Sequence, residues 1–465
     1  MVEDGSNYDL VILGSGPGGY VAGVRAGQLG MRTAVVERAE LGGICLNWGC
    51  IPSKALLRNA EVLSLFREAE RFGIHVDGLS ADFGKAVDRS RQVVDRLTRG
   101  VGYLLKKSGV EVVRGEGALI DPATVRVSGE GERTLATSNV IVATGARQRE
   151  LPNLPIDGSV VITSREALDL REAPPRVVIV GGGATGAEFA YLYRSYGSEV
   201  TVVEMLPRLV PLEDEEVGDQ LARSFKRMGI NVMTGSRVLK VGTGPEGASV
   251  AVSDGQAEET VACDRVLVAV GVTGNVEGIG LEEAGVSVES GFIPVDEKMA
   301  TNVAGVYAIG DVTGKLLLAH VASAQAVAAV ETIAGMDTPV LDYGLMPKAV
   351  YCQPQVASFG MTEEQARDSG RELKIGKFPL AASGKALAMA EQDGFVKVVS
   401  DAEVGEILGV HMIGSEVTEL LGEATLARLL EATTGEIGWL VHPHPTISEA
   451  LKEASLAAEG EAIHV

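Results

Sequence analysis

The chain has 465 residues, of which 46% are hydrophobic and 22% charged, and its formal net charge is −22. These values are typical of a globular protein of two to four domains. The negative surface repels phosphate backbones and so argues against a nucleic-acid partner. No apolar run reaches the ~18 residues that a membrane-spanning helix needs. The first residues are acidic and show no targeting signal, so we expect a cytoplasmic protein, in which structural disulfides are rare.

Residues 8–37 follow the pattern strand, glycine-rich turn, helix, strand. The apolar strand 8–13 runs into a turn that carries Gly14, Gly16 and Gly19. In such a turn the first glycine allows the sharp bend, the second lets backbone approach a pyrophosphate, and the third lets helix pack on strand. The second strand ends at Glu37, where a carboxylate accepts hydrogen bonds from ribose hydroxyls. The pattern predicts a dinucleotide site.

A pair of cysteines, Cys45 and Cys50, follows this unit by a few residues. They have no second pair nearby, as a zinc site would require, and no metal site is expected. A dithiol beside a dinucleotide indicates a redox function more than a structural bridge. Cys263 and Cys352 are interpreted as ordinary buried thiols.

A second copy of the glycine pattern spans 176–204. Its glycines are Gly181, Gly183 and Gly186, and its second strand ends at Glu204. The repeat predicts that the chain binds two dinucleotides. Glu204 would repel a 2′-phosphate, so NAD is favoured over NADP, although Arg208 is near enough to leave NADP open.

Further apolar strands fit a doubly wound α/β plan, at 139–145, 266–271 and 305–311. Asp311 ends the last of them, and an acid at that end of a strand points to the ligand crevice. From about residue 341 short strands alternate with helices without a dinucleotide signature, which indicates a further domain of α+β type.

The glycine motifs and the dithiol segment, together with the run 442–449, resemble the flavin disulfide reductases, and within them the dihydrolipoamide dehydrogenase group of 2-oxoacid dehydrogenase complexes. The resemblance covers essentially the whole chain. It rests on the two glycine motifs, on Ala143-Thr144-Gly145 and Gly310-Asp311, on Gly42-Gly43-Ile44-Cys45-Leu46-Asn47-Trp48-Gly49-Cys50-Ile51-Pro52-Ser53-Lys54, and on His442-Pro443-His444-Pro445-Thr446-Ile447-Ser448-Glu449.

The resemblance implies a homodimer with FAD and NAD as cofactors and the acyltransferase core of such a complex as partner. Each subunit would hold an FAD domain (1–148), an NAD domain (149–274), a central domain (275–340) and an interface domain (341–465). The first glycine motif would bind FAD and the second NAD. Further contacts to FAD are implied for Lys54, Gly117, Asp311 and Ala319, and to NAD for Val238 and Gly271.

The implied reaction oxidises a protein-bound dihydrolipoyl group and reduces NAD⁺. Cys45 would form the mixed disulfide with substrate, and the Cys50 thiolate would face the flavin. A thiol must lose its proton before it attacks a disulfide, and His444, held by Glu449, matches the family's base. Lys54 would stabilise charge near the flavin, paired with Glu188. His442 has no comparably placed acid and is assigned to packing.

The chain departs from the family pattern at Gly271-Val272-Thr273-Gly274-Asn275, where Gly-Arg-x-Pro-Asn is usual, and at Pro354-Gln355, where Pro-Glu is usual. Two alternatives stay open at this point. One is another NAD(P)H-dependent flavin disulfide reductase, such as a glutathione-type or mercuric reductase or an NADH oxidase. The other is a non-catalytic subunit of a complex.

Overall fold

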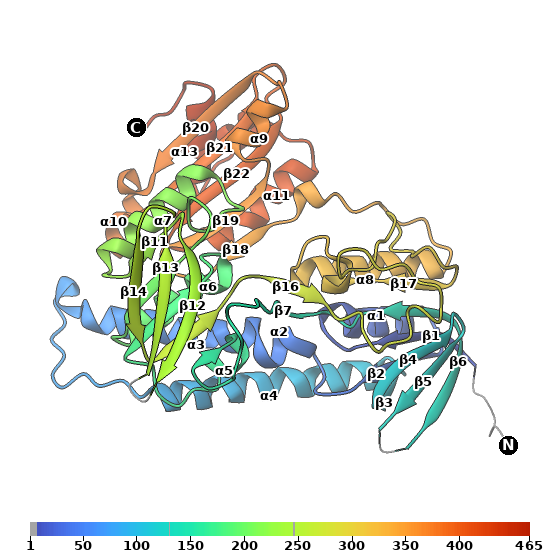
Figure 1. Ribbon diagram of the computed structural model, residues 1–465. Helices are drawn as coiled ribbons and strands as arrows, with labels where there is room; N and C mark the ends of the chain where they lie inside the picture. The colour runs from blue at the N-terminus through green and yellow to red at the C-terminus, as the bar shows by residue number, and fades with distance from the viewer. Residues whose placement is uncertain (1–6, 130, 245–246) are drawn as a thin grey trace. The chain divides into compact units, whose positions relative to one another are not determined.

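The computed structural model describes residues 7–129, 131–244 and 247–465, which fall into two compact units (Figure 1). The first unit takes in the chain up to residue 55 together with 87–149 and 271–341. The second takes in 56–86, 150–270 and 342–465. Helices α3 (Cys50–Arg67) and α4 (Phe83–Lys107) each contribute residues to both. The four-domain division expected from sequence stays a prediction.

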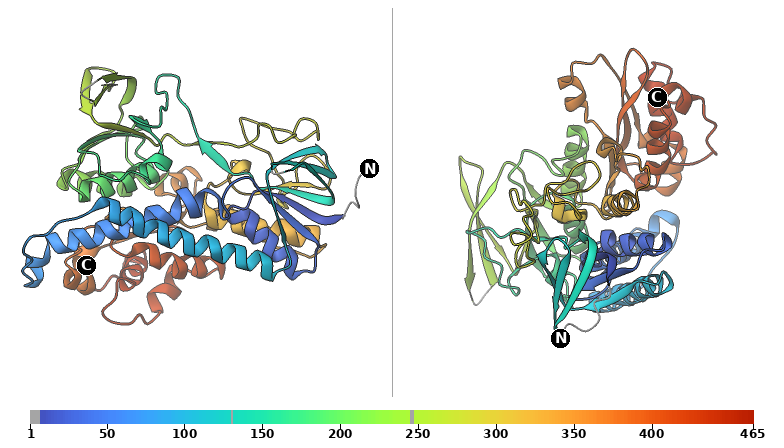
Figure 2. Two further views of the ribbon diagram at one scale, coloured as in Figure 1. Left: turned by 90° about the horizontal axis from the view of Figure 1, so that it is seen from below. Right: turned by 90° about the vertical axis from the view of Figure 1, so that its right-hand side faces the viewer.

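A seven-stranded sheet forms the centre of the first unit, in the order β3-β2-β1-β6-β5-β4, with β17 also paired to β6. Five strands run parallel: β1 (Tyr8–Leu13), β2 (Thr33–Glu37), β3 (Glu111–Arg114), β6 (Arg133–Val142) and β17 (Val306–Ala308). Strands β4 (Glu116–Asp121) and β5 (Thr124–Ser128) extend it as an antiparallel flap. Helices α1 (Pro17–Gln28) and α8 (Ala319–Ile333) pack against each other beside the sheet (Figure 2).

Both faces of this sheet are covered. In β1, Val11 and Leu13 belong to one buried apolar cluster, and Leu10 and Ile12 to another that includes residues of α1 and α8. A strand buried on both faces reads as a continuous apolar run, because neither set of alternate side chains meets water. This is why β1 is apolar from Leu10 to Leu13, whereas Asp9, near its start, is exposed.

The remaining elements of the first unit are short. Helix α2 (Gly43–Trp48) precedes α3, and β7 (Ala146–Gln148) pairs antiparallel with β16 (Val272–Gly274). The strand predicted at 139–145 forms the end of the longer β6 but stops at Val142, three residues earlier than expected. The strand predicted at 305–311 stops at Ala308, and Gly310–Thr313 form a 3₁₀ turn, η2.

The second unit holds another parallel sheet, ordered β11-β10-β9-β15-β8. Its strands are β8 (Val161–Ile162), β9 (Arg176–Val180), β10 (Glu199–Val203), β11 (Asn231–Met233) and β15 (Arg265–Val268). The associated helices are α5 (Ser164–Ala167), α6 (Ala184–Ser195) and α7 (Glu215–Arg227). A separate antiparallel sheet consists of β12 (Arg237–Gly244), β13 (Gly247–Ser253) and β14 (Glu258–Cys263).

The end of the chain forms an antiparallel sheet of order β18-β19-β22-β21-β20. Its strands are β18 (Lys348–Val350), β19 (Gln355–Gly360), β20 (Leu373–Pro379), β21 (Phe395–Asp401) and β22 (Ile407–Gly414). The helices of this region are α9 (Glu363–Asp368), α10 (Gly384–Met389), α11 (Leu421–Leu429), α12 (Thr434–Trp439) and α13 (Glu449–Ala458). Helix α13 packs on β20 and β21, so the sheet is covered by residues close to the end of the chain.

Candidate active site

A cavity of about 570 Å³ opens in the first unit beside the first glycine turn. Its volume lies within the range of small-molecule and cofactor pockets. Many of the residues singled out from sequence line it together: Gly14, Gly16, Glu37, Cys45, Cys50, Gly117, Asp311 and Ala319. These residues come from six separate stretches of chain, which the parallel sheet brings to one edge.

The glycine turn leaves room for a ligand where the pattern predicts a pyrophosphate. Gly14 has φ +101°, a conformation that other residues rarely adopt, and a Cβ on Gly19 would collide with the carbonyl oxygen of Gly14. A Cβ on Gly16 would meet no protein atom within 4 Å, although Gly16 precedes the first turn of α1 and lines the cavity. The opening therefore lies where helix N–H groups can bind an anion, and it fits a dinucleotide.

Glu37 and Asp311 are the two carboxyl groups of the cavity identified from sequence. Glu37 accepts hydrogen bonds from the N–H of Ser15 (2.9 Å) and the hydroxyl of Ser15 (2.6 Å), so it braces the turn as well as facing the site. Burial raises the pKa of Asp311 to about 6. Among the residues that the structure describes, none forms a hydrogen bond with this carboxyl. A partly buried carboxyl of this kind is suited to accept bonds from ligand hydroxyls.

We expect Gly16→Val to fill this opening and weaken flavin binding without unfolding the protein. Overpacking typically costs ~1–3 kcal/mol, or roughly 5- to 150-fold in affinity. Gly100→Val is the matched control, because a Cβ there also meets nothing within 4 Å but lies on α4. The measurement is the flavin content of purified protein and its affinity for added FAD. Equal flavin retention by both variants would contradict the assignment of the cavity.

Cys45 and Cys50 form a disulfide, with Cα atoms 4.7 Å apart. Cys45 lies in α2 and Cys50 is the first residue of α3, where the helix dipole favours a thiolate. Lys54 is one turn further along α3, on the same face as Cys50.

Asn47 and Ser15, which were not predicted as site residues, form hydrogen bonds that hold the disulfide segment. The side-chain amide of Asn47 donates to the carbonyl oxygens of Leu41 and Gly43, both at 2.9 Å. Gly42 N–H donates to the carbonyl oxygen of Ser15 at 3.0 Å, so the glycine turn and the disulfide segment are joined. The position of Asn47 between the two cysteines is the one sequence feature that could have pointed to its role.

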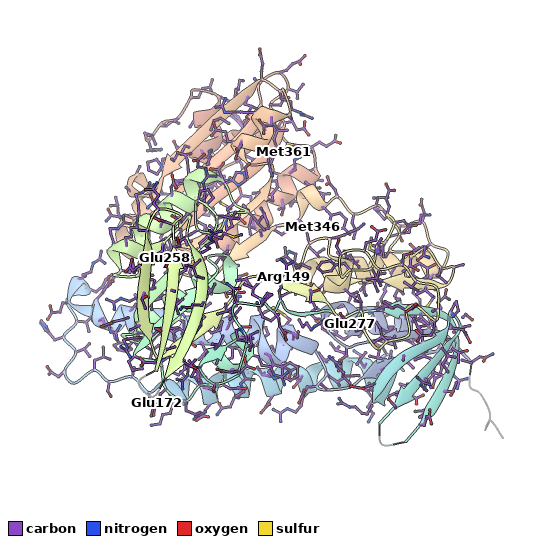
Figure 3. All side chains as sticks on the ribbon, viewed as in Figure 1. Arg149, Glu172, Glu258, Glu277, Met346 and Met361 are labelled. Atoms are coloured by element: carbon purple, nitrogen blue, oxygen red, sulfur yellow. A yellow bond between two sulfur atoms is a disulfide. The ribbon has the colours of Figure 1, made fainter. Side chains whose placement is uncertain are left out.

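In the cavity wall, Arg147 of β7 forms an ion pair with Glu277, which lies three residues beyond the end of β16. Arg147 donates two hydrogen bonds to Glu277, which is labelled in Figure 3, both at 2.8 Å, and one to the carbonyl oxygen of Gly274 at 2.9 Å. Val272, where the family usually has arginine, lies in β16. Gly271 has φ +92°, and its carbonyl oxygen accepts from Arg149 N–H at 3.0 Å. The departure from the family pattern thus lies in a short antiparallel pair of strands that are far apart in the sequence.

The second glycine turn repeats the geometry of the first. Gly181 has φ +106°, a Cβ on Gly186 would collide with the Gly181 carbonyl oxygen, and a Cβ on Gly183 would meet nothing within 4 Å. Glu204 is buried, and it accepts hydrogen bonds from Gly182 N–H at 2.6 Å and from Leu206 N–H at 2.8 Å. The recurrence of the same opening fits a second dinucleotide.

Arg208 and Val238 were also connected with the second dinucleotide site from the sequence. Arg208, the cation that left NADP open, pairs with Glu215 at 2.6 Å. Val238 lies in β12, and its carbonyl oxygen accepts from Asn153 at 2.8 Å. The paired Arg208 strengthens the expectation of NAD.

His444 and Glu449 form the predicted pair. His444 Nδ1 is 2.9 Å from a carboxylate oxygen of Glu449, whose other oxygen accepts from Thr446 N–H at 2.8 Å. Burial alone would raise the pKa of Glu449, but the bonds from Thr446 and His444 outweigh it and lower that pKa. The carboxylate therefore stays ionised and can orient the imidazole, whose side chain is 78% exposed in the single chain.

One expectation about a neighbouring group needs correction. His442 does have an acid: its Nε2 lies 2.7 Å from a Glu423 oxygen, and its side chain is only 4% exposed. Glu188 lies in α6, is buried and accepts from Tyr351 N–H at 3.0 Å. Its pairing with Lys54 stays a prediction.

Comparison with known proteins agrees with this geometry. Residues 8–326 match the family model described as pyridine nucleotide-disulphide oxidoreductase, and residues 346–455 match the dimerisation domain of that family. The chain belongs to this family. Its members of the dihydrolipoyl dehydrogenase group use FAD and NAD(H), which confirms the cofactors predicted from sequence.

Several relatives are similar over nearly their whole length. Dihydrolipoyl dehydrogenase from Bacillus subtilis is 47% identical, with 99% of each chain covered. The protein of that name from Mycobacterium leprae is 50% identical, covering 96% of this chain and 97% of its own. The crystal structure of LpdA from Mycobacterium tuberculosis has a TM-score of 0.90 at 27% identity, covering 96% and 98%. The predicted fold class, two Rossmann-like domains and a C-terminal α+β dimerisation domain, is confirmed.

No helix in the described ranges is long and apolar enough to cross a membrane.

Proposed function

We propose that this enzyme is a dihydrolipoyl dehydrogenase that oxidises protein-bound dihydrolipoyl groups and reduces NAD⁺. The observation that carries the proposal is the Cys45–Cys50 disulfide in the wall of the cavity that also holds the first glycine turn. A disulfide at this place can undergo thiol–disulfide exchange with a substrate dithiol and, once reduced, pass its electrons to a dinucleotide bound in the cavity. The identity to enzymes of that name over almost the whole chain supports the same reaction.

The dithiol half of the reaction uses this chain's own side chains. A substrate thiolate attacks the sulfur of Cys45, the Cys45–Cys50 bond breaks, and Cys50 leaves as a thiolate. The second substrate thiolate then attacks the substrate sulfur that is bonded to Cys45. The bond to Cys45 breaks, the substrate leaves as a disulfide, and the enzyme keeps both electrons as a dithiol. Gly14, Gly16, Glu37 and Asp311 line the cavity that would hold FAD, which would supply the chemistry for passing that electron pair from the dithiol to NAD⁺ as hydride.

His444 removes the proton that each substrate thiol must lose. Its imidazole is oriented through Nδ1 by Glu449, which leaves Nε2 to accept the proton. The 78% exposure of His444 in the single chain suits a site completed by assembly. We propose a homodimer through the region that matches the dimerisation domain, with each active site shared between subunits.

The proposal also covers partner and compartment. We propose that the substrate is a lipoyl group on the acyltransferase core of a 2-oxoacid dehydrogenase complex, in the cytoplasm. A negative chain, at −22, is suited to a basic docking segment on that core. Cys263 and Cys352 are buried thiols, as expected in a reducing compartment.

The test is the rate of NAD⁺ and NADP⁺ reduction by dihydrolipoamide. We expect NAD⁺ to be strongly preferred and Glu204→Arg to relax that preference, since arginine accommodates a 2′-phosphate. Because Glu204 also accepts the Gly182 and Leu206 N–H groups, the variant is expected to lose affinity for NAD⁺ as well. Glu199→Arg is the control, an equal charge change at the exposed start of β10. Equal use of both nucleotides by the unmodified enzyme would refute the reading.

A further inference from the structure

The segment 205–214 follows strand β10 and Glu204 and leads into helix α7, and it contacts the second glycine turn. Directly before the segment, the Glu204 carboxylate accepts from Gly182 N–H at 2.6 Å. Within the segment, Val210 N–H donates to the Gly182 carbonyl oxygen at 2.8 Å. The segment therefore backs the part of the turn that faces a bound dinucleotide. Any shift of the segment moves Gly182.

Val210 has an unfavourable backbone. Its φ is +42°, in a region that β-branched residues rarely adopt, and the residue is buried at 4% exposure. Such a conformation persists only where surrounding contacts determine it. At the start of the segment the glycine turn supplies those contacts, and the end must be held as well.

The end of the segment is held by a buried lysine of the last sheet. Lys397, in β21, is 1% exposed. Its ammonium lies 3.0 Å from Asp214, 3.0 Å from Glu216 and 2.6 Å from Glu363. Asp214 also accepts the N–H of Glu363 at 3.1 Å and that of Glu216 at 3.2 Å. The side chains of Lys397 and Asp214 are both 2% exposed, so separating them would leave the Asp214 charge in the interior without its cation.

A second set of contacts lies next to it. Lys348 Nζ donates to the Leu212 carbonyl oxygen at 3.2 Å and lies 3.5 Å from Glu213, and the Ser358 hydroxyl donates to Glu213. Residues 212–214 are therefore anchored to β18, β19 and β21, and residues 204–210 to the glycine turn.

We propose that Lys397 is a positioning residue for NAD⁺, acting through Asp214 on the segment that supports Gly182 and Glu204. The inference rests on the proposed function, since it assumes that the second glycine turn binds NAD. It adds that the C-terminal sheet, which contains neither glycine motif, sets the geometry of the nucleotide site.

If Lys397 only held α7 against the last sheet, any other contact between that helix and that sheet should matter equally for NAD⁺ binding. The same helix is tied at its far end, where Asp393 accepts from Gln220 at 2.7 Å and from Ser224 at 2.5 Å. That contact joins the same two regions but does not touch segment 205–214. Asp393→Asn is therefore the matched control for Asp214→Asn.

The experiment compares the KM for NAD⁺, the KM for dihydrolipoamide, and the rate at which dihydrolipoamide reduces the enzyme without NAD⁺. Mutations along such networks typically change coupling by an amount equal to roughly 2- to 30-fold. We expect Asp214→Asn and Lys397→Met to raise the KM for NAD⁺ within that range and leave both dithiol measurements unchanged. Asp393→Asn should leave all three unchanged. If Lys397→Met does not fold, the KM for NAD⁺ of Asp214→Asn alone tests the inference.

An unchanged KM for NAD⁺ in Asp214→Asn, or the same rise in Asp393→Asn, overturns the inference. Binding of NADH to each oxidised protein, followed by its fluorescence, separates this result from failure of the proposed function. If the unmodified enzyme does not bind NADH, the proposed function fails and the inference with it. If it binds NADH and Asp214→Asn binds equally well, only the inference fails.

Discussion

Cys50→Ser and Cys45→Ser are each expected to abolish dihydrolipoamide oxidation, by roughly 10³-fold or more, the scale on which loss of a covalent nucleophile acts. Neither variant can form the disulfide that accepts the substrate's electrons. The two differ in what remains: Cys45→Ser keeps the thiol at the start of α3, and Cys50→Ser keeps the one in α2.

Absorption spectroscopy tests the two roles. A Cys50 thiolate beside the flavin is expected to give a long-wavelength band, which should be present in Cys45→Ser and missing in Cys50→Ser. The reverse pattern would mean that the roles of the two sulfurs are exchanged. Cys263→Ser is the control: burial raises the pKa of that thiol to about 11, so it should change neither spectrum nor rate.

His444→Ala is expected to lower dihydrolipoamide oxidation by ~10²–10⁴-fold, the usual cost of removing a general base. NADH-driven reduction of one-electron dyes should persist, since it needs no thiol deprotonation. The control is His464→Ala, because His464 has the same arrangement, with Nδ1 2.8 Å from Glu453, at an exposed position. Equal loss in both variants would assign the effect to folding of the C-terminal region.

His442→Ala is expected to keep the thiol chemistry, in agreement with the packing role predicted from the sequence. Because His442 contacts Glu423 in the structure, the variant is also expected to lose stability. Removing the imidazole leaves the Glu423 carboxylate without the partner it has at 2.7 Å. Thermal unfolding together with the rate separates these effects: a lower Tm with a near-normal rate agrees with a packing role.

Mixing Cys45→Ser and His444→Ala subunits tests whether active sites are shared. One site of the hybrid dimer would have both residues intact, so part of the activity should return after reassortment. If the mixture stays inactive while wild-type enzyme treated in the same way recovers, each site belongs to one subunit.

The sequence by itself determined the features whose cause is local. A glycine that must adopt φ near +100°, as Gly14 and Gly181 do, is visible in any such turn because no other residue suits it. The disulfide is also local, since Cys45 and Cys50 are close along the chain. The family followed from these motifs, and His444 with Glu449 was accessible because five residues of chain join them.

Only the tertiary structure decided which distant residues meet. Glu423 is 19 residues from His442, and Asp214 is 183 residues from Lys397. Nothing in the sequence near Lys397 distinguishes a buried lysine from an exposed one, because burial is set by the segments that pack over it. The same holds for Asp311: its position at the end of a strand suggested a ligand, but the burial that raises its pKa comes from the folded cavity.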